Sequence, residues 1–212
     1  SVHEEVMRLV SKEQVIPNLN LINSFYDHPQ LIKVFADNAR DLGDLDQWDH
    51  ILFSYHGLPQ RHLKKGDRSG CHCYADGTNS CCSSIQKVNQ FCYSAQCHAT
   101  TRALVAKLGL KEGTYSTSFQ SRLGFDEWAK PYTIETLEDL AKNKGVKRIL
   151  CFSPAFVSDC LETTIEISVE YQEEFIEWGG EHIQLVPSLN DDPRWVKAVV
   201  EMLRQETGVA AS

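Results

Sequence analysis

Residues 50–59, which read His-Ile-Leu-Phe-Ser-Tyr-His-Gly-Leu-Pro, decide the fold of this chain. The run from 50 to 55 is rich in aliphatic and aromatic side chains, which is typical of a strand. Gly57 and Pro59 favour turns, so the strand should stop beside them. His56 therefore lies where the chain leaves the strand, and we expect its imidazole to project into a crevice.

Similar apolar runs alternate with segments of helical period along the rest of the chain. Strands are expected at residues 20–24, 50–55, 114–120, 148–152 and 182–186. Helices are expected at residues 3–13, 29–42, 93–108, 133–144, 159–178 and 192–205. Strands that alternate with helices predict an α/β fold, with a Rossmann-type parallel sheet covered by helices on both faces.

Composition and charge narrow the function classes. The chain has 212 residues, 42% of them hydrophobic, and its 21 basic and 29 acidic residues give a net charge of −8. No basic run could follow a phosphate backbone, so nucleic acid is not an expected partner. No stretch reaches the roughly 18 apolar residues of a membrane span and no signal peptide is visible. We therefore expect a cytoplasmic protein without a transmembrane segment, with peripheral membrane contact left open.

The carboxyl ends of parallel strands carry the reactive groups of such folds, which directs attention to residues 54–59 and 153–162. An imidazole titrates near neutral pH, so His56 could take a proton or bind Fe²⁺. The alternative is a structural histidine that only bonds to a neighbouring loop. Aromatic residues that could wall an apolar site between the two loops, or belong to the core, are Tyr55, Phe119 and Trp128.

A long helix is expected after the second loop, and Glu162, Glu166 and Glu170 recur on it every fourth residue. A stripe of this kind is in many helices a solvated face. Here Glu162 lies in the first turn, at the mouth of the crevice. Carboxylates lined up from that point could pass protons or cations along the helix.

Several ordered motifs resemble one known family. They are Phe-Ser-Tyr-His-Gly-Leu-Pro at 53–59, Phe-Gln-Ser-Arg at 119–122, Trp128 with Pro131, and Asp-Cys-Leu-Glu-Thr at 159–163, extended by residues 22–29 and 187–190. In this order and spacing they resemble ferrochelatase, the enzyme that inserts ferrous iron into a porphyrin. The resemblance implies a chelatase-like fold, in which residues 1–48 end an N-terminal half and residues 49–212 form the C-terminal α/β domain. Because the chain begins at Ser1 rather than Met, the missing N-terminal half is also an expected partner.

The resemblance also implies roles for individual residues. His56 would bind the incoming iron or accept pyrrole protons, and Glu162 would act with it from across the porphyrin. Glu166 and Glu170 would continue an acidic path along the helix, and Asp159 would support the site near His56. Together with Tyr55, the implied porphyrin contacts are Phe119, Trp128 and Phe156. Protoporphyrin IX is the expected porphyrin, and ferrous iron is the expected second substrate.

Eight cysteines are present, and six of them fall between Cys71 and Cys97. Clustering of this kind favours a metal group over a disulfide framework. Residues 68–92 form an insert relative to the family, and many relatives carry a cysteine that matches Cys97. The candidates for four ligand positions are therefore Cys71, Cys73, Cys81, Cys82 and Cys92. Some microbial ferrochelatases are similar in holding a two-iron two-sulfur cluster on an internal segment, which implies this cluster here; zinc is the alternative, followed by free thiols.

Two other functions stay open. A related chelatase could use His56 and Glu162 on another tetrapyrrole or another metal. A non-enzymatic iron–sulfur sensor or binding protein could be built on a degenerate chelatase half, and this reading predicts loss of His56 or Glu162. Both residues are present.

Overall fold

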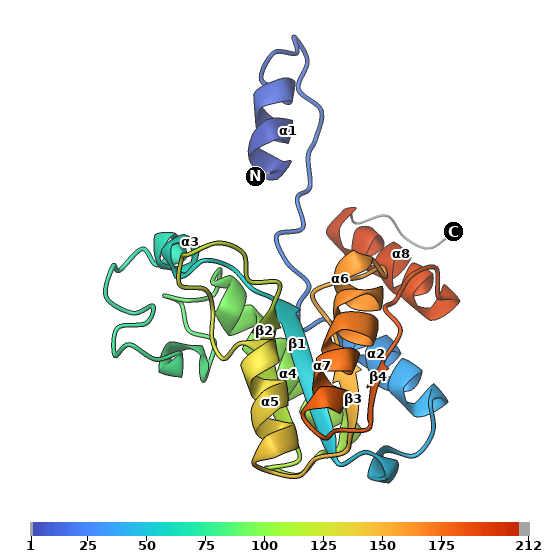
Figure 1. The fold of residues 1–212 in the computed structure, drawn as a ribbon. Coiled ribbons are helices and arrows are strands. Elements are labelled where there is room, and N and C mark those ends of the chain that lie inside the picture. Colours follow the sequence, from blue (N-terminus) through green and yellow to red (C-terminus); the bar gives the residue numbers. More distant parts are fainter. Residues whose placement is uncertain (1, 208–212) are drawn as a thin grey trace.

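The computed structural model describes residues 2–207 and contains a four-stranded parallel sheet in the order β2-β1-β3-β4 (Figure 1). The strands are β1 (His50–His56), β2 (Tyr115–Gln120), β3 (Arg148–Phe152) and β4 (His182–Leu185). Central β1 pairs with β2 along its length, where His56 lies opposite Gln120, and with β3 on the other side. Because all pairs are parallel, the carboxyl ends of the strands meet at one edge.

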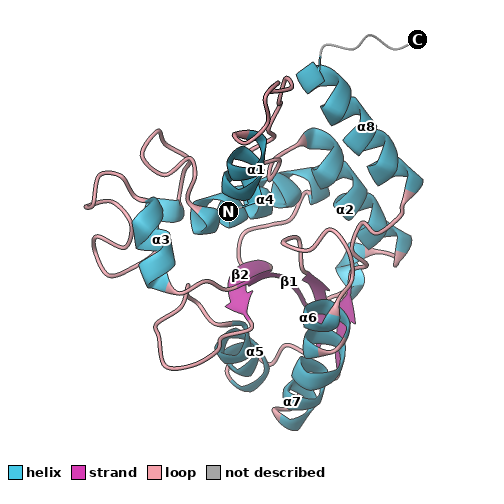
Figure 2. Cartoon of the chain, turned by 90° about the horizontal axis from the view of Figure 1, so that it is seen from above, coloured by secondary structure: helices cyan, strands magenta, loops and turns pink. Residues whose placement is uncertain are grey.

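Helices cover both faces of this sheet, which confirms the expected α/β class (Figure 2). One layer contains α2 (Pro29–Asp41), α4 (Tyr93–Leu108) and α8 (Pro193–Thr207), and the other contains α5 (Thr133–Lys142), α6 (Leu161–Thr164) and α7 (Gln172–Glu177). The remaining elements are α1 (Val2–Val10), α3 (Gln60–Gly66), the 3₁₀ turns η1 (Leu45–Gln47) and η2 (Ser80–Cys82), and the π-helical segment η3 (Glu166–Tyr171). No helix within residues 2–207 is long and apolar enough to cross a bilayer.

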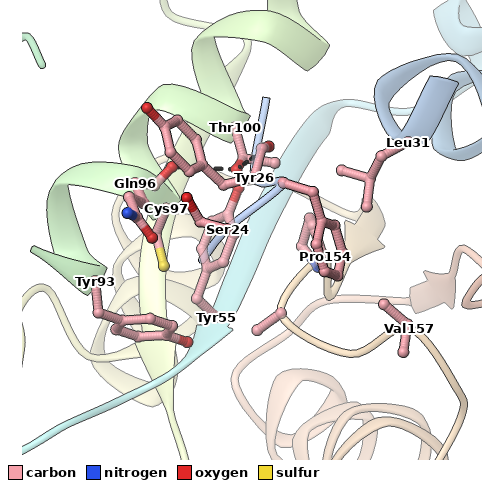
Figure 3. A pocket seen from close by; sticks show the side chains of 12 residues that line it. Ser24, Tyr26, Leu31, Tyr55, Tyr93, Gln96, Cys97, Thr100, Pro154 and Val157 are labelled. Atoms are coloured by element: carbon pink, nitrogen blue, oxygen red, sulfur yellow. Dashed lines mark hydrogen bonds between the residues drawn. The ribbon is translucent and has the colours of Figure 1, made fainter. Parts of the chain in front are cut away.

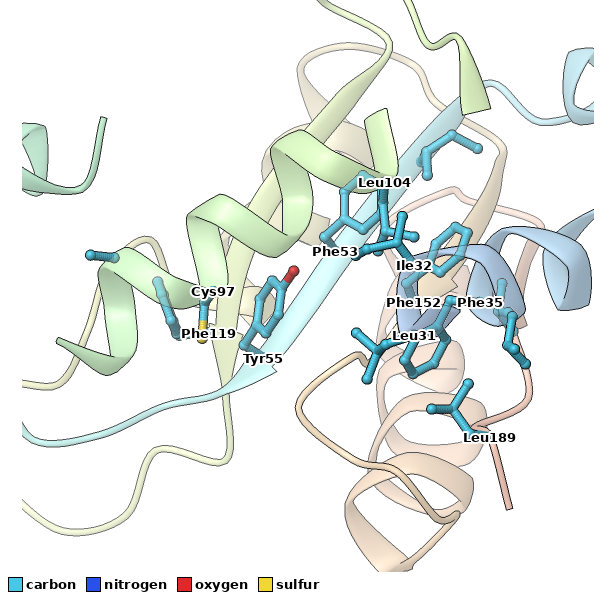
Figure 4. Close-up of a cluster of buried hydrophobic side chains, with 14 of the residues drawn as sticks. Leu31, Ile32, Phe35, Phe53, Tyr55, Cys97, Leu104, Phe119, Phe152 and Leu189 are labelled. Carbon is cyan, nitrogen blue, oxygen red and sulfur yellow. The ribbon is translucent and has the colours of Figure 1, made fainter. Parts of the chain in front are cut away.

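Alternation along β1 divides its side chains between two cores. Phe53 and Tyr55 belong to the core formed with α2 and α4, where they pack near Leu104 (Figure 4). Leu52 belongs to the core on the other face, with Leu137 of α5 and other buried residues. Burial on both faces explains why this strand is apolar almost throughout and why it lies in the middle of the sheet.

The strand expected at residues 20–24 is wrong. This stretch has no regular structure and forms part of an extended arm that joins α1 to α2 (Figure 1). A strand needs a neighbour for its backbone hydrogen bonds, and the sheet of the described residues pairs with no part of the arm. Helix α1 at the start of the arm has no buried residue.

The single α-helix expected at residues 159–178 is also wrong in detail. It starts at Leu161, changes to π-helical geometry in η3 and continues as α7. In the π-helical segment the backbone amide of Glu170 bonds to the carbonyl of Ile165 at 3.0 Å, five residues earlier. An exact four-residue stripe of glutamates therefore does not persist along this helix.

Candidate active site

His56 is the last residue of β1, and its ring is half-buried at the carboxyl edge of the sheet. Its Nδ1 atom lies 2.7 Å from the carbonyl oxygen of Gly57. A carbonyl oxygen only accepts, so Nδ1 carries the hydrogen and Nε2 of the neutral ring keeps its lone pair. Nε2 is therefore the nitrogen available to take a proton or to bind a metal.

Two aromatic rings flank this imidazole. The ring centroids of His56 and Trp128 are 6.2 Å apart, and those of His56 and Phe156 are 6.1 Å apart. Phe156 lies in the loop after β3, and Trp128 lies in the loop after β2. The structure thus brings together three of the expected site residues, each from a loop or strand end at the same edge.

Gly57 makes the approach of Trp128 to the strand end possible. A Cβ atom at position 57 would lie 3.0 Å from the Gln120 carbonyl oxygen and 3.0 Å from Cε3 of Trp128. The backbone amide of Ala129 donates to the carbonyl of Leu58 at 2.9 Å, which holds the two loops together. A side chain at position 57 would push these loops apart.

Glu162 lies in the first turn of α6 and is half-buried. A hydrogen bond from the Cys160 thiol lowers the pKa of Glu162, and the charge on a protonated His56 lowers it further. This electrostatic interaction places the two side chains near one another. Glu162 is therefore ionised at neutral pH and can balance positive charge there.

The side chain of Gln120 joins the strand ends to the long helix. Its amide donates to the backbone carbonyl of Glu162 at 2.7 Å and to the Glu166 carboxylate at 3.0 Å. Its carbonyl oxygen accepts from the hydroxyls of Ser54 at 2.7 Å and Ser153 at 3.2 Å. With 1% of its surface exposed, Gln120 is a buried polar link between three strands and the helix.

The Glu166 carboxylate points back toward the strand ends. Besides Gln120, it accepts hydrogen bonds from the Ser121 amide at 2.8 Å, the Ser121 hydroxyl at 2.5 Å and the Tyr171 hydroxyl at 2.7 Å. Ser121 has a positive φ of 63°, which turns both of its donors to the same carboxylate. Four donors hold Glu166 in one orientation, as expected for an anchor of the helix.

The other two carboxylates lie in different surroundings. Asp159 accepts from the Asn190 amide at 2.8 Å and from the Ser188 backbone amide at 3.2 Å, which ties the start of the helix to the loop after β4. Burial alone would raise the pKa of Asp159, but these hydrogen bonds lower it overall. Glu170 is exposed in a surface hollow that it shares with Glu174.

Tyr55 and Phe119, both expected to contact a porphyrin, are each only 1% exposed. The Tyr55 hydroxyl bonds to that of Thr101 at 2.9 Å, and the ring of Phe119 packs against those of Tyr55 and His98. Both residues support the site from within the core, and their direct contact with a ligand stays a prediction.

A cavity of about 210 Å³ lies between the arm, α4 and the loop after β3. Its lining includes Tyr26, Tyr93 and Pro154 (Figure 3). Small-molecule sites usually enclose about 300–1,000 Å³, so this cavity by itself is too small for a macrocycle.

The segment between α3 and α4 brings most of the candidate cysteines together. Cys81 and Cys82 have their sulfurs 3.9 Å apart, and the thiol of Cys92 interacts with those of Cys82 and Cys73. Burial raises the pKa of Cys73 to about 12, whereas a hydrogen bond from Cys82 and backbone amides at the start of α4 lower the pKa of Cys92. Cys71 is exposed, and its sulfur lies 3.6 Å from the Ser69 hydroxyl.

Some contributors to the site were not among the expected residues. From the sequence, Gln120 and Ser121 were considered only as part of the motif at residues 119–122. A glutamine at the end of a buried strand does, however, predict a side chain that is buried and hydrogen-bonded. Nothing in the sequence indicated Tyr93 as a site residue. Its hydroxyl lies 2.8 Å from the His56 carbonyl oxygen only because the fold brings α4 beside the end of β1.

The parallel sheet carries His56 at the end of β1 and Glu162 in the first turn of α6, which follows β3, and so defines an α/β protein with polar side chains at the carboxyl edge of its sheet. The sequence profile of the ferrochelatase family matches residues 1–207. A ferrochelatase of Pseudomonas putida is 42% identical over 203 residues, covering 95% of this chain and 59% of the relative. Two of Pseudomonas fluorescens are 44% identical, covering 94% and 95% of this chain and 58% of each relative.

The chain belongs to the ferrochelatase family. It spans 58–59% of the length of these curated relatives. The expectation drawn from the ordered motifs is thereby confirmed at the level of the family.

Proposed function

We propose that the protein containing this chain inserts ferrous iron into a porphyrin, protoporphyrin IX in the first instance, to form haem. The observation that carries the proposal is the paired arrangement of His56 and Glu162, with Nε2 of His56 free and Glu162 ionised beside it. Trp128 and Phe156 flank the imidazole as apolar walls. This combination suits a flat apolar ligand that must exchange protons for a cation.

The reaction replaces two pyrrole protons by Fe²⁺ and transfers no electrons. Nε2 of His56 accepts a pyrrole proton, and its imidazolium is stabilised by the Glu162 carboxylate. Glu162 receives the cation or the second proton on the other side of the porphyrin. Carboxylate oxygens suit this role because they bind iron more reversibly than thiolates do. Glu166 acts through Gln120, whose side-chain amide donates both to the Glu166 carboxylate and to the backbone carbonyl of Glu162 and so holds the start of the helix.

His56→Ala in the full-length protein tests the proposal. We expect iron insertion to be lost while the fold is retained, since the ring is only half-buried. Insertion at nearly the normal rate would remove His56 from the mechanism. Parallel assays with Co²⁺, Mg²⁺ and other tetrapyrroles would separate the proposed activity from that of a related chelatase.

We further propose that Cys73, Cys81, Cys82 and Cys92 hold a two-iron two-sulfur cluster and that Cys71 does not. These four side chains lie near one another: the sulfurs of Cys81 and Cys82 are 3.9 Å apart, and Cys92 interacts with both Cys82 and Cys73. Cys71 is exposed, and its sulfur lies beside the Ser69 hydroxyl. Four thiolates can hold either an iron–sulfur cluster or zinc, and the spacing here is not the paired C-x₂-C of a zinc ribbon.

The cluster, when bound, would supply a structural or regulatory group, because metal insertion needs no electron. An anaerobic visible spectrum together with iron and zinc analysis tests this assignment. Iron with charge-transfer bands supports the cluster, and stoichiometric zinc without colour contradicts it. The cytoplasmic location, the second half of the porphyrin site from an N-terminal region and contact with a membrane surface are further parts of the proposal.

A further inference from the structure

The peptide unit between His56 and Gly57 is held at both ends. Its N–H group donates to the Gln120 carbonyl at 2.9 Å, and its carbonyl oxygen accepts from the Tyr93 hydroxyl at 2.8 Å. The next carbonyl, that of Gly57, receives the Nδ1 hydrogen of His56. The orientation of this peptide thus decides whether the imidazole finds its acceptor.

Tyr93 is placed for this task by its position in α4. It is the first residue of the helix, and its ring borders the cavity between the arm, α4 and the loop after β3 (Figure 3). A tyrosine hydroxyl ordinarily titrates near 10, so it keeps its proton at neutral pH. It therefore remains a donor to the His56 carbonyl.

We propose that Tyr93 is a positioning residue for His56. By fixing the carbonyl of His56 it keeps that of Gly57 in reach of Nδ1, so the neutral imidazole presents an unprotonated Nε2. The proposal rests on the proposed role of His56 as base or iron ligand. It also links the cysteine segment to the site, since Tyr93 follows Cys92 directly and the thiol of Cys92 interacts with those of Cys82 and Cys73.

Cys97 takes its place in the same arrangement. It is 4% exposed, and its side chain interacts with that of Tyr93 one helical turn away. This contact gives Cys97 a packing role beside Tyr93. The chain of contacts runs from Cys97 to Tyr93 and from Tyr93 to His56.

The test replaces Tyr93 by Phe in the full-length protein labelled with ¹⁵N-histidine. The ring that borders the cavity stays, and only the donated hydrogen is lost. We expect the fraction of the Nδ1–H tautomer of His56 to fall, and kcat for iron insertion to fall about tenfold, with KM for porphyrin changed less than about twofold. Signals that vanish in His56→Ala identify the His56 resonances.

Tyr115→Phe is the matched control, because Tyr115 lies at the start of β2 and its ring packs on Phe53. It should leave the tautomer and kcat unchanged, and both variants should keep their thermal midpoint and visible absorption. A His56 tautomer in Tyr93→Phe that equals the wild type would overturn the proposal. Because the tautomer is read without turnover, an inactive protein would count against the proposed function and not against the role of Tyr93.

Discussion

Gln120 lies directly opposite His56 in the paired strands β1 and β2, and its side chain reaches across to Glu166 at 3.0 Å. One residue thereby fixes the strand end that carries the histidine and the helix that carries Glu162. We expect Gln120→Leu to reduce kcat by about one to two orders of magnitude, because His56 and Glu162 would no longer be positioned by the same side chain. The variant should also lose about 1–3 kcal/mol of stability, since the Ser153 hydroxyl and one Glu166 acceptor are left unpaired. Urea unfolding and steady-state kinetics measure the two effects, and unchanged kinetics would make Gln120 a purely structural residue.

Glu162→Gln removes a charge and preserves the shape of the side chain. We expect iron insertion to slow by about 10² or more, as for the loss of a group that exchanges protons, while the porphyrin Kd changes only a few-fold. Stopped-flow insertion and fluorescence quenching of bound porphyrin separate the two quantities. Collapse of porphyrin binding at a normal residual rate would place Glu162 in the wall of the site instead.

The cysteines should divide into two groups. Single Cys→Ser changes at positions 73, 81, 82 and 92 are expected to bleach the visible bands or lower the iron content. Cys71→Ser is the matched control within the same segment, and Cys97→Ser is the control in α4; both should retain colour. Loss of the cluster in Cys71→Ser together with its retention in one of the four would reassign the ligands.

Two histidines, the buried His50 and the half-buried His98, make the fold sensitive to acid. Burial lowers the pKa of His50 and of His98 to about 4, so both are neutral in the folded protein. Unfolded histidines titrate near 6.5, so the unfolded state binds more protons below that pH and stability falls as the pH drops from about 6.5 to 4. Each should cost about 2 kcal/mol between pH 8 and pH 5. Urea midpoints over this range test the prediction, and His50→Gln should show a shallower slope than the wild type.

Gly57→Ala should be more harmful than its size suggests. The added methyl group would meet a backbone oxygen and the Trp128 ring at 3.0 Å, so the loops around His56 must separate. We expect insertion activity to fall at least tenfold with a modest loss of stability. Gly66→Ala is the matched control, because no atom lies within 4 Å of a Cβ there.

Most of the fold was predictable because apolar periodicity reports burial directly. β1, β3 and the helices that cover them follow from this pattern, as does the placement of His56 at a strand end. The arm at residues 20–24 misled the prediction, because an apolar stretch does not reveal whether a neighbouring strand exists. Glu166 was recognised as part of the acidic stripe, but its four donors come from residues whose approach depends on the tertiary fold. The same holds for Tyr93 and for the choice among five cysteines.

The π-helical segment η3 lets this helix hold one residue more than a regular α-helix between the same end points. A π turn accommodates one residue more than an α turn, and here it lies between the anchored Glu166 and the fully buried Phe175. Each residue turns the side-chain direction by about 100° around an α-helix, and the wider π turn absorbs this rotation, so that Phe175 stays in the core. Deleting one residue from η3 should therefore leave a regular α-helix with α7 facing the same way, whereas a deletion inside α7 before Phe175 should turn this residue out of the core. In evolution, the length of η3 is therefore freer to change by one residue than the length of α7.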